Sequence, residues 1–364
     1  MSEPDPAAPR RVLVTSSVRW AWVSEVSSYL RVIDLEQARV TFLAPVPESR
    51  WREHDPNPRG GARGARGISV HGDRLVVANG ERLFVFDPSW QLVDQLSHPM
   101  LSNVHDILAE ENGVWATACG CDMLIRLNWE GELEEWWSFR DDRGLYRKLG
   151  YHRRNLPRVS PDLDYRDPRV QAETADLVHL NGVVRSVDGL LLSFGCVTNT
   201  GEPDAFAIVR LADKRPHRPR SASLLLHLRG VGVPNHNIGQ EDDLLVYNDS
   251  NANRLVAVDA SSGDERVSVD IPGDPGFARG LARIGPGRWL VGSQAPLAVY
   301  AVDLRRGEII ASYPLGGVEN ETVYGICALP DAFGDPPPVR MTDEDPYAFW
   351  RQVSPGTGFT PIPA

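Results

Sequence analysis

The chain has 364 residues, 42% of them hydrophobic, and carries a formal net charge of −11. This charge argues against a nucleic-acid backbone as a partner, and no apolar run reaches the roughly 18 residues of a membrane-spanning helix. The first residues, MSEPDPAAPRR, contain no apolar signal core, and the four cysteines show no disulfide spacing typical of secreted proteins. We therefore expect a cytoplasmic protein with neither nucleic acid nor membrane as a partner.

Strand-like segments predominate along the chain, and six of them repeat one pattern. Each combines a short strand, a turn rich in Gly or Asp, and a second strand. In chain order the six segments start at or near Arg66, His105, His179, His236, Arg279 and Tyr324. Recurrence of such a unit at intervals of roughly 40 residues is typical of a β-propeller. A third and a fourth strand follow in most repeats, which predicts four-stranded blades.

In this interpretation, strands from the two ends of the chain together form one blade. Three N-terminal strands, at 12–16, 29–34 and 39–44, have no innermost strand before them, and the strand at 323–329 has no partner strands after it. We expect this last strand to join the N-terminal blade, because closing the ring protects the open sheet edges. The sequence thus predicts an all-β, six-bladed propeller that forms a single domain over residues 1–364.

Two segments depart from the repeat. Residues 141–177 form a long, polar insertion rich in arginine and aromatic residues, and segments of this length in a compact domain are typically functional. We expect this insertion to act as a lid that closes over substrate through Tyr146, His152, Arg153 and Tyr165. Residues 331–364 are rich in proline and are expected to form a C-terminal tail.

The propeller topology brings residues that are distant in sequence to one mouth of the central channel. The loop that enters each innermost strand lies on the same face as the turn between the second and third strands of a blade. The entry loops supply His105, His179, His236, Arg66, Arg279 and Tyr324, and the turns supply Cys119, Cys121, Cys196, Asp249 and Asn251. A polar throat of this kind is the default hypothesis for a binding site.

Three histidines from neighbouring blades favour a metal site, since imidazole is a common ligand of Zn, Fe and Cu. The ion would act as a Lewis acid or generate hydroxide at neutral pH. Arg66 and Arg279 would bind a carboxylate or a developing oxyanion, and Tyr324 would act as an acid or base. Asp106 and Asp249 are candidates for orienting a ligand histidine through a hydrogen bond.

Alternatives stay open at this point. His179 is the least regular of the three histidines, because Asn181 fits the repeat two residues later and faces the same side of a strand. The histidines could act in catalysis or binding without a metal, or serve the structure alone. Cys119 and Cys121 are separated by one residue, whereas zinc-binding pairs prefer two or more, so we interpret them as part of a tight turn.

The stretches VWATACGCDMLIRLNWEGELEEWW and GFARGLARIGPGRWLVGSQ resemble blades of bacterial six-bladed propellers related to arylsulfotransferases. That resemblance implies a covalent histidine intermediate, with His105, His179 and His236 as nucleophile and acid/base candidates and Arg279 holding the sulfate. The histidine pattern is also similar to that of peptidyl-amidoglycolate lyase, a six-bladed propeller with three channel histidines on zinc.

The sequence therefore predicts an enzyme that acts on a small molecule, anionic in the simplest case, through a divalent transition metal on His105, His179 and His236. Lyase, hydrolytic and oxidative chemistry all fit this prediction. Metal-free group transfer through a histidine is the second hypothesis, and a non-catalytic module that binds protein partners is the third.

Overall fold

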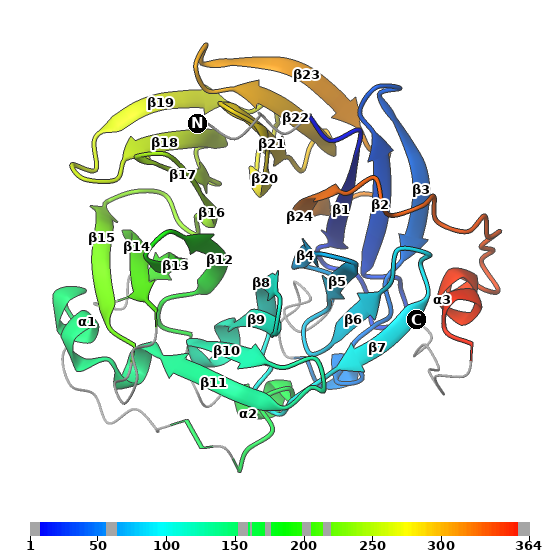
Figure 1. The fold of residues 1–364 in the computed structure, drawn as a ribbon, viewed down its shortest axis with the longest axis horizontal. Helices are drawn as coiled ribbons and strands as arrows, with labels where there is room; N and C mark the ends of the chain where they lie inside the picture. The colour runs from blue at the N-terminus through cyan, green and yellow to red at the C-terminus, as the bar shows by residue number, and fades with distance from the viewer. Residues whose placement is uncertain are drawn as a thin grey trace.

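The computed structural model describes residues 8–55, 64–151, 159–160, 162–171, 176–198, 205–213 and 220–355. Their strands form six four-stranded sheets, which stand as blades around a common centre (Figure 1). The prediction of an all-β, six-bladed propeller is confirmed. No helix in these ranges is long and apolar enough to cross a membrane.

The blades are numbered in chain order, and the strands of each are given from the innermost outward. Blade 1 contains β24 (Glu321–Leu329), β1 (Arg11–Val18), β2 (Ser28–Asp34) and β3 (Arg39–Pro45). Blade 2 contains β4 (Ile68–His71), β5 (Arg74–Ala78), β6 (Leu83–Phe86) and β7 (Leu92–Leu96). Blade 3 contains β8 (Val104–Glu110), β9 (Gly113–Ala118), β10 (Met123–Leu127) and β11 (Leu133–Ser138).

The second half of the chain repeats this order without interruption. Blade 4 contains β12 (Leu180–Ser186), β13 (Gly189–Val197), β14 (Ala205–Ala212) and β15 (Ala222–Arg229). Blade 5 contains β16 (His236–Glu241), β17 (Leu244–Asp249), β18 (Arg254–Asp259) and β19 (Glu265–Asp270). Blade 6 contains β20 (Arg279–Gly285), β21 (Arg288–Gly292), β22 (Ala298–Asp303) and β23 (Glu308–Pro314).

Strand composition follows the position of each strand within its blade. Middle strands such as β9, with the sequence GVWATA, are buried at every position, because neighbouring blades cover both of their faces. Outermost strands such as β3 and β23 alternate exposed and less exposed residues, which is the pattern of a strand with one face in solvent. Apolar burial between adjacent blades thus holds the ring together.

The ring closes through blade 1, as predicted. Strand β24 pairs antiparallel with β1, with Val12 opposite Ala328. A buried ion pair strengthens this junction, since Nη1 of Arg31 on β2 lies 2.5 Å from Oε1 of Glu321 on β24. Nη2 of Arg31 lies 3.1 Å from Oε2 of the same carboxylate, which makes the contact bidentate.

β-bulges interrupt five of the innermost strands near the channel mouth. Register shifts fall at positions 105–106 of β8, 181 of β12, 237–238 of β16, 280 of β20 and 324 of β24. Bulges re-aim side chains and are common beside active sites. Three bulge side chains also join adjacent blades: Asp106 accepts a bond from Val183 N–H, Asn181 donates to Asn235 C=O, and Asn237 accepts from Gly280 N–H.

The short helices lie outside the ring or at its edges. They are η1 (Arg52–His54), η2 (Cys119–Cys121), η3 (Phe139–Asp141), α1 (Arg143–Lys148), α2 (Pro168–Gln171) and α3 (Ala348–Val353). The described parts of the 141–177 insertion that carry α1 and α2 lie at the perimeter in Figure 1. The lid role of this insertion stays a prediction, because much of the segment lies outside the described residues.

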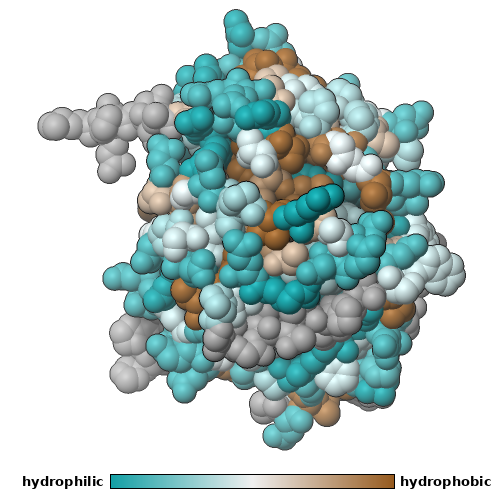
Figure 2. All heavy atoms as spheres, turned by 90° about the vertical axis from the view of Figure 1, so that its right-hand side faces the viewer, coloured by the Kyte–Doolittle hydropathy of each residue, from teal (hydrophilic) through white to brown (hydrophobic). Residues whose placement is uncertain are grey.

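The C-terminal tail packs against the outside of blades 1 and 2 as far as the structure describes it. Phe349 and Trp350 of α3 are fully buried in one apolar cluster with Phe84 and Phe86. Between residues 341–347 and strands β2 and β3 lies a groove of about 650 Å³. Figure 2 faces this side of the molecule, where apolar atoms are visible in a hollow bordered by hydrophilic side chains.

Candidate functional site

Three histidines from successive blades lie close together at or just before the start of their innermost strands. His105 lies at the bulge of β8, His179 directly precedes β12, and His236 is the first residue of β16. The ring centroids of His105 and His179 are 4.7 Å apart, and those of His179 and His236 are 6.0 Å apart. The repeat therefore brings the three histidine rings near one another, but the group of ligand atoms close enough to hold a metal ion comprises His105, His179 and Cys119, without His236.

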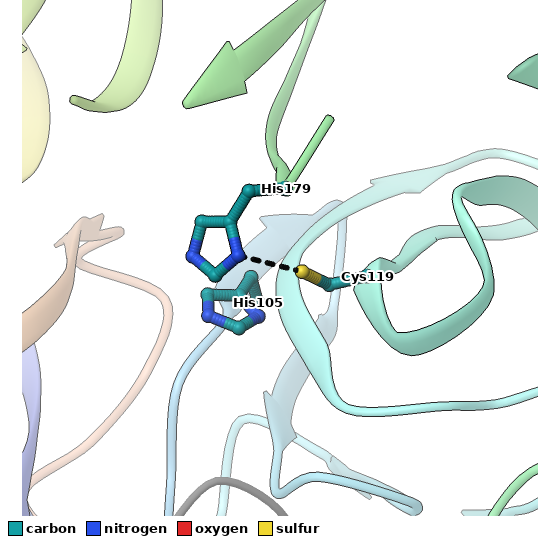
Figure 3. Close-up of side chains that lie close together, drawn as sticks. All are labelled: His105, Cys119 and His179. Atoms are coloured by element: carbon teal, nitrogen blue, oxygen red, sulfur yellow. Dashed lines mark hydrogen bonds between the residues drawn. The ribbon is translucent and has the colours of Figure 1, made fainter. Parts of the chain in front are cut away.

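His179 also contacts the thiol of Cys119 (Figure 3), and its ring faces the carboxylate of Asp176. Its Nδ1 lies 3.2 Å from Sγ of Cys119 in η2 and 2.6 Å from Oδ2 of Asp176. The ligand atoms of His105, Cys119 and His179 all lie within 4.8 Å of one another, and this group could hold a metal ion. Burial and the charges of Asp176 and Asp122 raise the pKa of the Cys119 thiol well above its ordinary value.

The loop that presents His179 is held by a buried carboxylate. Oδ1 of Asp122 accepts hydrogen bonds from the backbone N–H groups of Leu177 and Val178, both at 3.1 Å. Arg140 donates to Oδ2 of the same carboxylate at 3.0 Å. Since His179 has a φ of 50°, which costs energy for a residue with a side chain, these contacts and the bond to Asp176 explain how the loop keeps this conformation.

Hydrogen bonds fix the proton position on each histidine ring. Nδ1 of His105 lies 2.9 Å from the carbonyl oxygen of Asn103, which can only accept, so Nδ1 carries the proton. Nδ1 of His179 likewise faces the carboxylate of Asp176. In its neutral form each ring is therefore the Nδ1–H tautomer, with its lone pair on Nε2.

His236 follows the same rule with a hydroxyl as its partner. Nδ1 of His236 lies 2.8 Å from Oγ of Ser250, and Oγ donates its own hydrogen to the carbonyl of Ala278 at 2.6 Å. The Ser250 oxygen thus accepts from Nδ1–H. Nε2 of His236 is buried without a hydrogen-bond partner among the described residues. A buried lone pair of this kind is costly to leave unsatisfied.

Burial keeps two of the histidines neutral. It lowers the pKa of His105 well below the ordinary value, and the nearby Arg66, His179 and Arg279 add to this effect. Burial and Arg279 likewise lower the pKa of His236. Both rings are therefore uncharged at neutral pH, which is the form that binds metal ions or acts as a nucleophile.

Arginines surround the histidines on the side of blades 1, 2 and 6. Nη1 of Arg66 lies 3.0 Å from both ring nitrogens of His105. Because Nη1 is equally distant from both ring nitrogens, this guanidinium lies against the imidazole ring and not along the in-plane lone pair of Nε2. Cζ of Arg279 lies 3.4 Å from the ring centroid of Tyr324, and Cζ of Arg19 lies 5.2 Å from that of Phe277.

The positive charges change the titration of Arg279 and Tyr324. Burial, together with Arg66 and Arg19, lowers the pKa of Arg279 to about 10. Burial alone would raise the pKa of Tyr324, but Arg279, Arg66 and Arg19 outweigh it and lower the pKa below its ordinary value. The Tyr324 hydroxyl is therefore more acidic than a free phenol.

The two aspartates predicted to orient a histidine have other partners. Oδ2 and Oδ1 of Asp106 accept the backbone N–H groups of Val183 and Ile107. Oδ2 of Asp249 binds Arg254 at 2.8 Å, which fixes the turn between β17 and β18. The groups that orient the histidines are instead Asn103 C=O, Asp176 and Ser250.

The remaining predicted side chains lie in packed or interblade positions. Asn181 is buried and bonds Ser193 and the carbonyl of Asn235, because the bulge of β12 turns it toward blade 5. Tyr165 is fully buried, and its hydroxyl accepts the N–H of Ser160. Tyr146 stacks near Phe139 and Tyr151 at the perimeter. His152 and Arg153 lie outside the described residues.

Sequence reasoning did not assign a role to four of the residues found here. Cys119 was interpreted as a turn residue, and Asp176, Ser250 and Arg19 were not singled out. Asp176 lies three residues before His179. Proximity to this predicted site residue was the only signal available for Asp176.

Comparison with known proteins identifies the architecture. No protein-family model and no curated protein matches the chain. A solved structure of a protein of unknown function from Bacteroides caccae is 10% identical, with a TM-score of 0.54 over 88% of this chain and 98% of that chain. The structure of a nidogen/laminin complex contains a chain that is 12% identical, with a TM-score of 0.52 and the same coverage of both chains.

A streptogramin B lyase structure is 14% identical and covers 75% of this chain and 71% of its own, with a TM-score of 0.44. Identities this low show the fold alone. Kinship with arylsulfotransferase-like or amidoglycolate lyase-like propellers stays a prediction, and any argument for function must come from the throat itself.

Proposed function

We propose that the protein is an enzyme whose throat binds one divalent transition-metal ion through Nε2 of His105, His179 and His236. The observation that carries this proposal is the common tautomer of the three rings. Each donates Nδ1–H to a fixed acceptor, and metal-binding histidines are oriented in this way by the groups around them. The buried, unpartnered Nε2 of His236 supports the same reading.

Cys119 is the alternative third ligand, since it forms a compact group with His105 and His179. Its sulfur approaches Nδ1 of His179, the nitrogen that already donates to Asp176. A metal ion bound to Nε2 of His179 would therefore lie on the opposite side of the imidazole ring from the Cys119 sulfur. Because this contact lies on the Nδ1 side of the His179 ring, we assign the third position to His236.

Arg66 opposes metal binding in the arrangement described above. Its guanidinium lies 3.0 Å from Nε2 of His105, and it carries a positive charge. Ligation by His105 therefore requires Arg66 to turn away from the ring. Removal of this charge should tighten metal binding, which separates our proposal from one in which Arg66 and His105 form a permanent pair.

When bound, the ion would supply Lewis acidity or an activated water to the reaction. The chain's own residues would do the rest. Arg279 and Arg66 would bind the anionic group of a small-molecule substrate through charge-assisted hydrogen bonds. Tyr324, with its lowered pKa, would give or take a proton at Oη. Lyase, hydrolytic and oxidative reactions are all consistent with these groups, and imidazole ligands suit Zn, Fe and Cu alike.

Metal analysis by inductively coupled plasma mass spectrometry tests the proposal on protein purified without an affinity tag. We expect about one transition-metal ion per chain in the native protein and in His71→Ala, whose histidine is exposed on β4. The ion should be lost from His105→Ala and His236→Ala and kept in Cys119→Ser. Protein that contains no metal and takes up no Zn, Fe or Cu would end the proposal and leave metal-free histidine group transfer as the better account.

A further inference from the structure

The throat holds a buried positive charge that makes no ion pair with a carboxylate among the described residues, although Asp106 interacts with it electrostatically from a greater distance. Arg279 is 6% exposed, and burial, Tyr324, Arg66 and Arg19 are the influences that dominate its titration. Within the described ranges, no aspartate or glutamate forms an ion pair with Arg279 or with Arg19. A buried charge is costly unless it is paired, so this arrangement favours an incoming anion.

Tyr324 compensates this charge only in part. The guanidinium of Arg279 stacks on the face of the Tyr324 ring, 3.4 Å from its centroid. A cation over an aromatic face gains less than one paired with a carboxylate. Arg279 also forms a side-chain hydrogen bond with Tyr324. No carboxylate of the described residues pairs with the guanidinium, whose planar fork matches a carboxylate group in a bidentate contact.

Aromatic side chains surround Arg19 on the turn between β1 and β2. Arg19 N–H donates to Asn320 C=O at 2.9 Å, which places this turn beside the start of β24. The neighbouring Trp20 and Trp22 are 53% and 74% exposed, although tryptophan is usually well buried. Phe277 lies beneath Arg19 and 5.3 Å from His236, measured between ring centroids.

The positive group and the aromatic groups therefore lie on connected parts of one mouth. Phe277 contacts both Arg19 and His236, and Arg19 acts electrostatically on Arg279, Tyr324 and His236. A ligand that places an anionic group near Arg279 has an apolar surface available at Phe277 and at the exposed tryptophans. A positive charge beside an aromatic surface fits a ligand that carries an anionic group on an aromatic body.

We propose that the throat recognises an aromatic carboxylate, with the carboxylate bound by Arg279 and Arg19 and the ring packed against Phe277 and the Trp20/Trp22 turn. This inference rests on the proposed function, since it names the substrate class of the same site, and it assigns Arg19 in place of Arg66 as the second arginine that binds the anionic group. It is independent of the metal, because none of these four contacts involves a metal ligand's Nε2. The two ideas can therefore fail separately.

Isothermal titration calorimetry of the full chain with phenylacetate, acetate and 2-phenylethylamine tests the inference. The titration is done on protein as purified and again after dialysis against a chelator. We expect saturable binding of phenylacetate in both preparations, much weaker binding of acetate, and none of the amine. If phenylacetate binds after metal removal, the inference stands even when the metal proposal fails. If metal is present and phenylacetate does not bind, only the inference is overturned.

Variants assign the contacts. Arg279→Met and Arg19→Met should each weaken phenylacetate binding at least tenfold, about the contribution of one charge-assisted hydrogen bond. Arg19 is half-buried, so Arg19→Met should fold even where Arg279→Met does not, and it tests the same carboxylate contact. The exposed Arg288 on β21 supplies the matched control, Arg288→Met, which should bind as the native chain does.

The tryptophans are tested by selectivity. Trp20→Ala and Trp22→Ala should reduce the preference for phenylacetate over acetate while leaving acetate binding unchanged. Equal phenylacetate affinity in Arg279→Met and the native chain would overturn the inference. Binding of phenyl phosphate more than tenfold tighter than phenylacetate would overturn the assignment of a carboxylate.

Discussion

The hydroxyl of Ser250 provides a sharp test of how His236 is prepared for its role. Ser250 is fully buried, and its Oγ accepts from Nδ1–H of His236 while donating to the carbonyl of Ala278. The substitution Ser250→Ala removes both contacts and adds no bulk. The His236 ring must then either keep a buried N–H without an acceptor or move its proton to Nε2.

Either outcome has a calculable cost. A buried donor left without a partner costs about 1–3 kcal/mol, so the free energy of unfolding of metal-free Ser250→Ala should fall by about that amount. A shift of the proton to Nε2 would relieve this cost but would consume the lone pair that binds the metal. Loss of an orienting group of this kind weakens metal binding by about 10–100-fold, and we expect the same for zinc here.

Urea denaturation of the chelator-treated protein measures the first quantity, and zinc titration against a competing chelator measures the second. Ser24→Ala is the control, because Ser24 is exposed on the turn between β1 and β2 and should change neither value by a measurable amount. Native-like zinc affinity in Ser250→Ala would refute the argument that this hydroxyl sets the tautomer of His236.

Three further predictions follow from other contacts. Arg31→Met should lower the free energy of unfolding, measured by urea denaturation, by about 3–5 kcal/mol, because it leaves Glu321 buried without its ion-pair partner. The double variant Arg31→Met/Glu321→Leu should recover most of that loss. A loss below about 1 kcal/mol in the single variant would contradict the role of this pair in ring closure. Burial raises the pKa of Asp106 to about 7, so the contribution of its protonated form to the free energy of unfolding is complete below pH 3.8 and is lost as pH rises through 7. Relative to the native chain, Asp106→Asn should therefore become more stable between pH 4 and 8. A constant difference in the free energy of unfolding across that range would contradict the raised pKa. Arg66→Met should bind zinc more tightly than the native chain in competition titrations, whereas weaker binding would show that Arg66 supports the site.

The sequence predicts the ring well because the repeat is encoded in local patterns. Each repeat has a polar residue at or near the start of its innermost strand, and the turn after that strand is rich in Gly, Asp or Asn. The incomplete N-terminal blade and the isolated strand at 323–329 also predict the closure, since unpaired strand edges are unfavourable. Hydrophobic period and turn chemistry are sufficient for this level of structure.

The site is predicted only at the level of which blades contribute. The histidines, Arg66, Arg279 and Tyr324 lie at or near the starts of successive innermost strands, so the repeat alone brings them together. Their hydrogen-bond partners depend on the bulges, which turn Asp106 and Asn181 away from the channel and toward the next blade. One extra residue in a strand decides this direction, and no sequence pattern used here reports it.

The second limit is the loop before β12. The conformation of His179, with a φ of 50°, is imposed by Asp122 and Arg140 in blade 3, which are distant in sequence. Local residue preferences cannot anticipate such a tertiary constraint. The contact between His179 and Cys119 follows from it, which explains why a turn cysteine became a neighbour of the histidines.

X-ray absorption at the metal edge of the zinc-reconstituted protein tests the central claim most directly. Ligation by three imidazoles predicts scattering shells of nitrogen or oxygen at about 2.0–2.1 Å, imidazole multiple scattering, and no sulfur shell. A sulfur shell at about 2.3 Å would place Cys119 in the coordination sphere and contradict the assignment of His236. Zinc that does not bind at all would contradict the metal site itself.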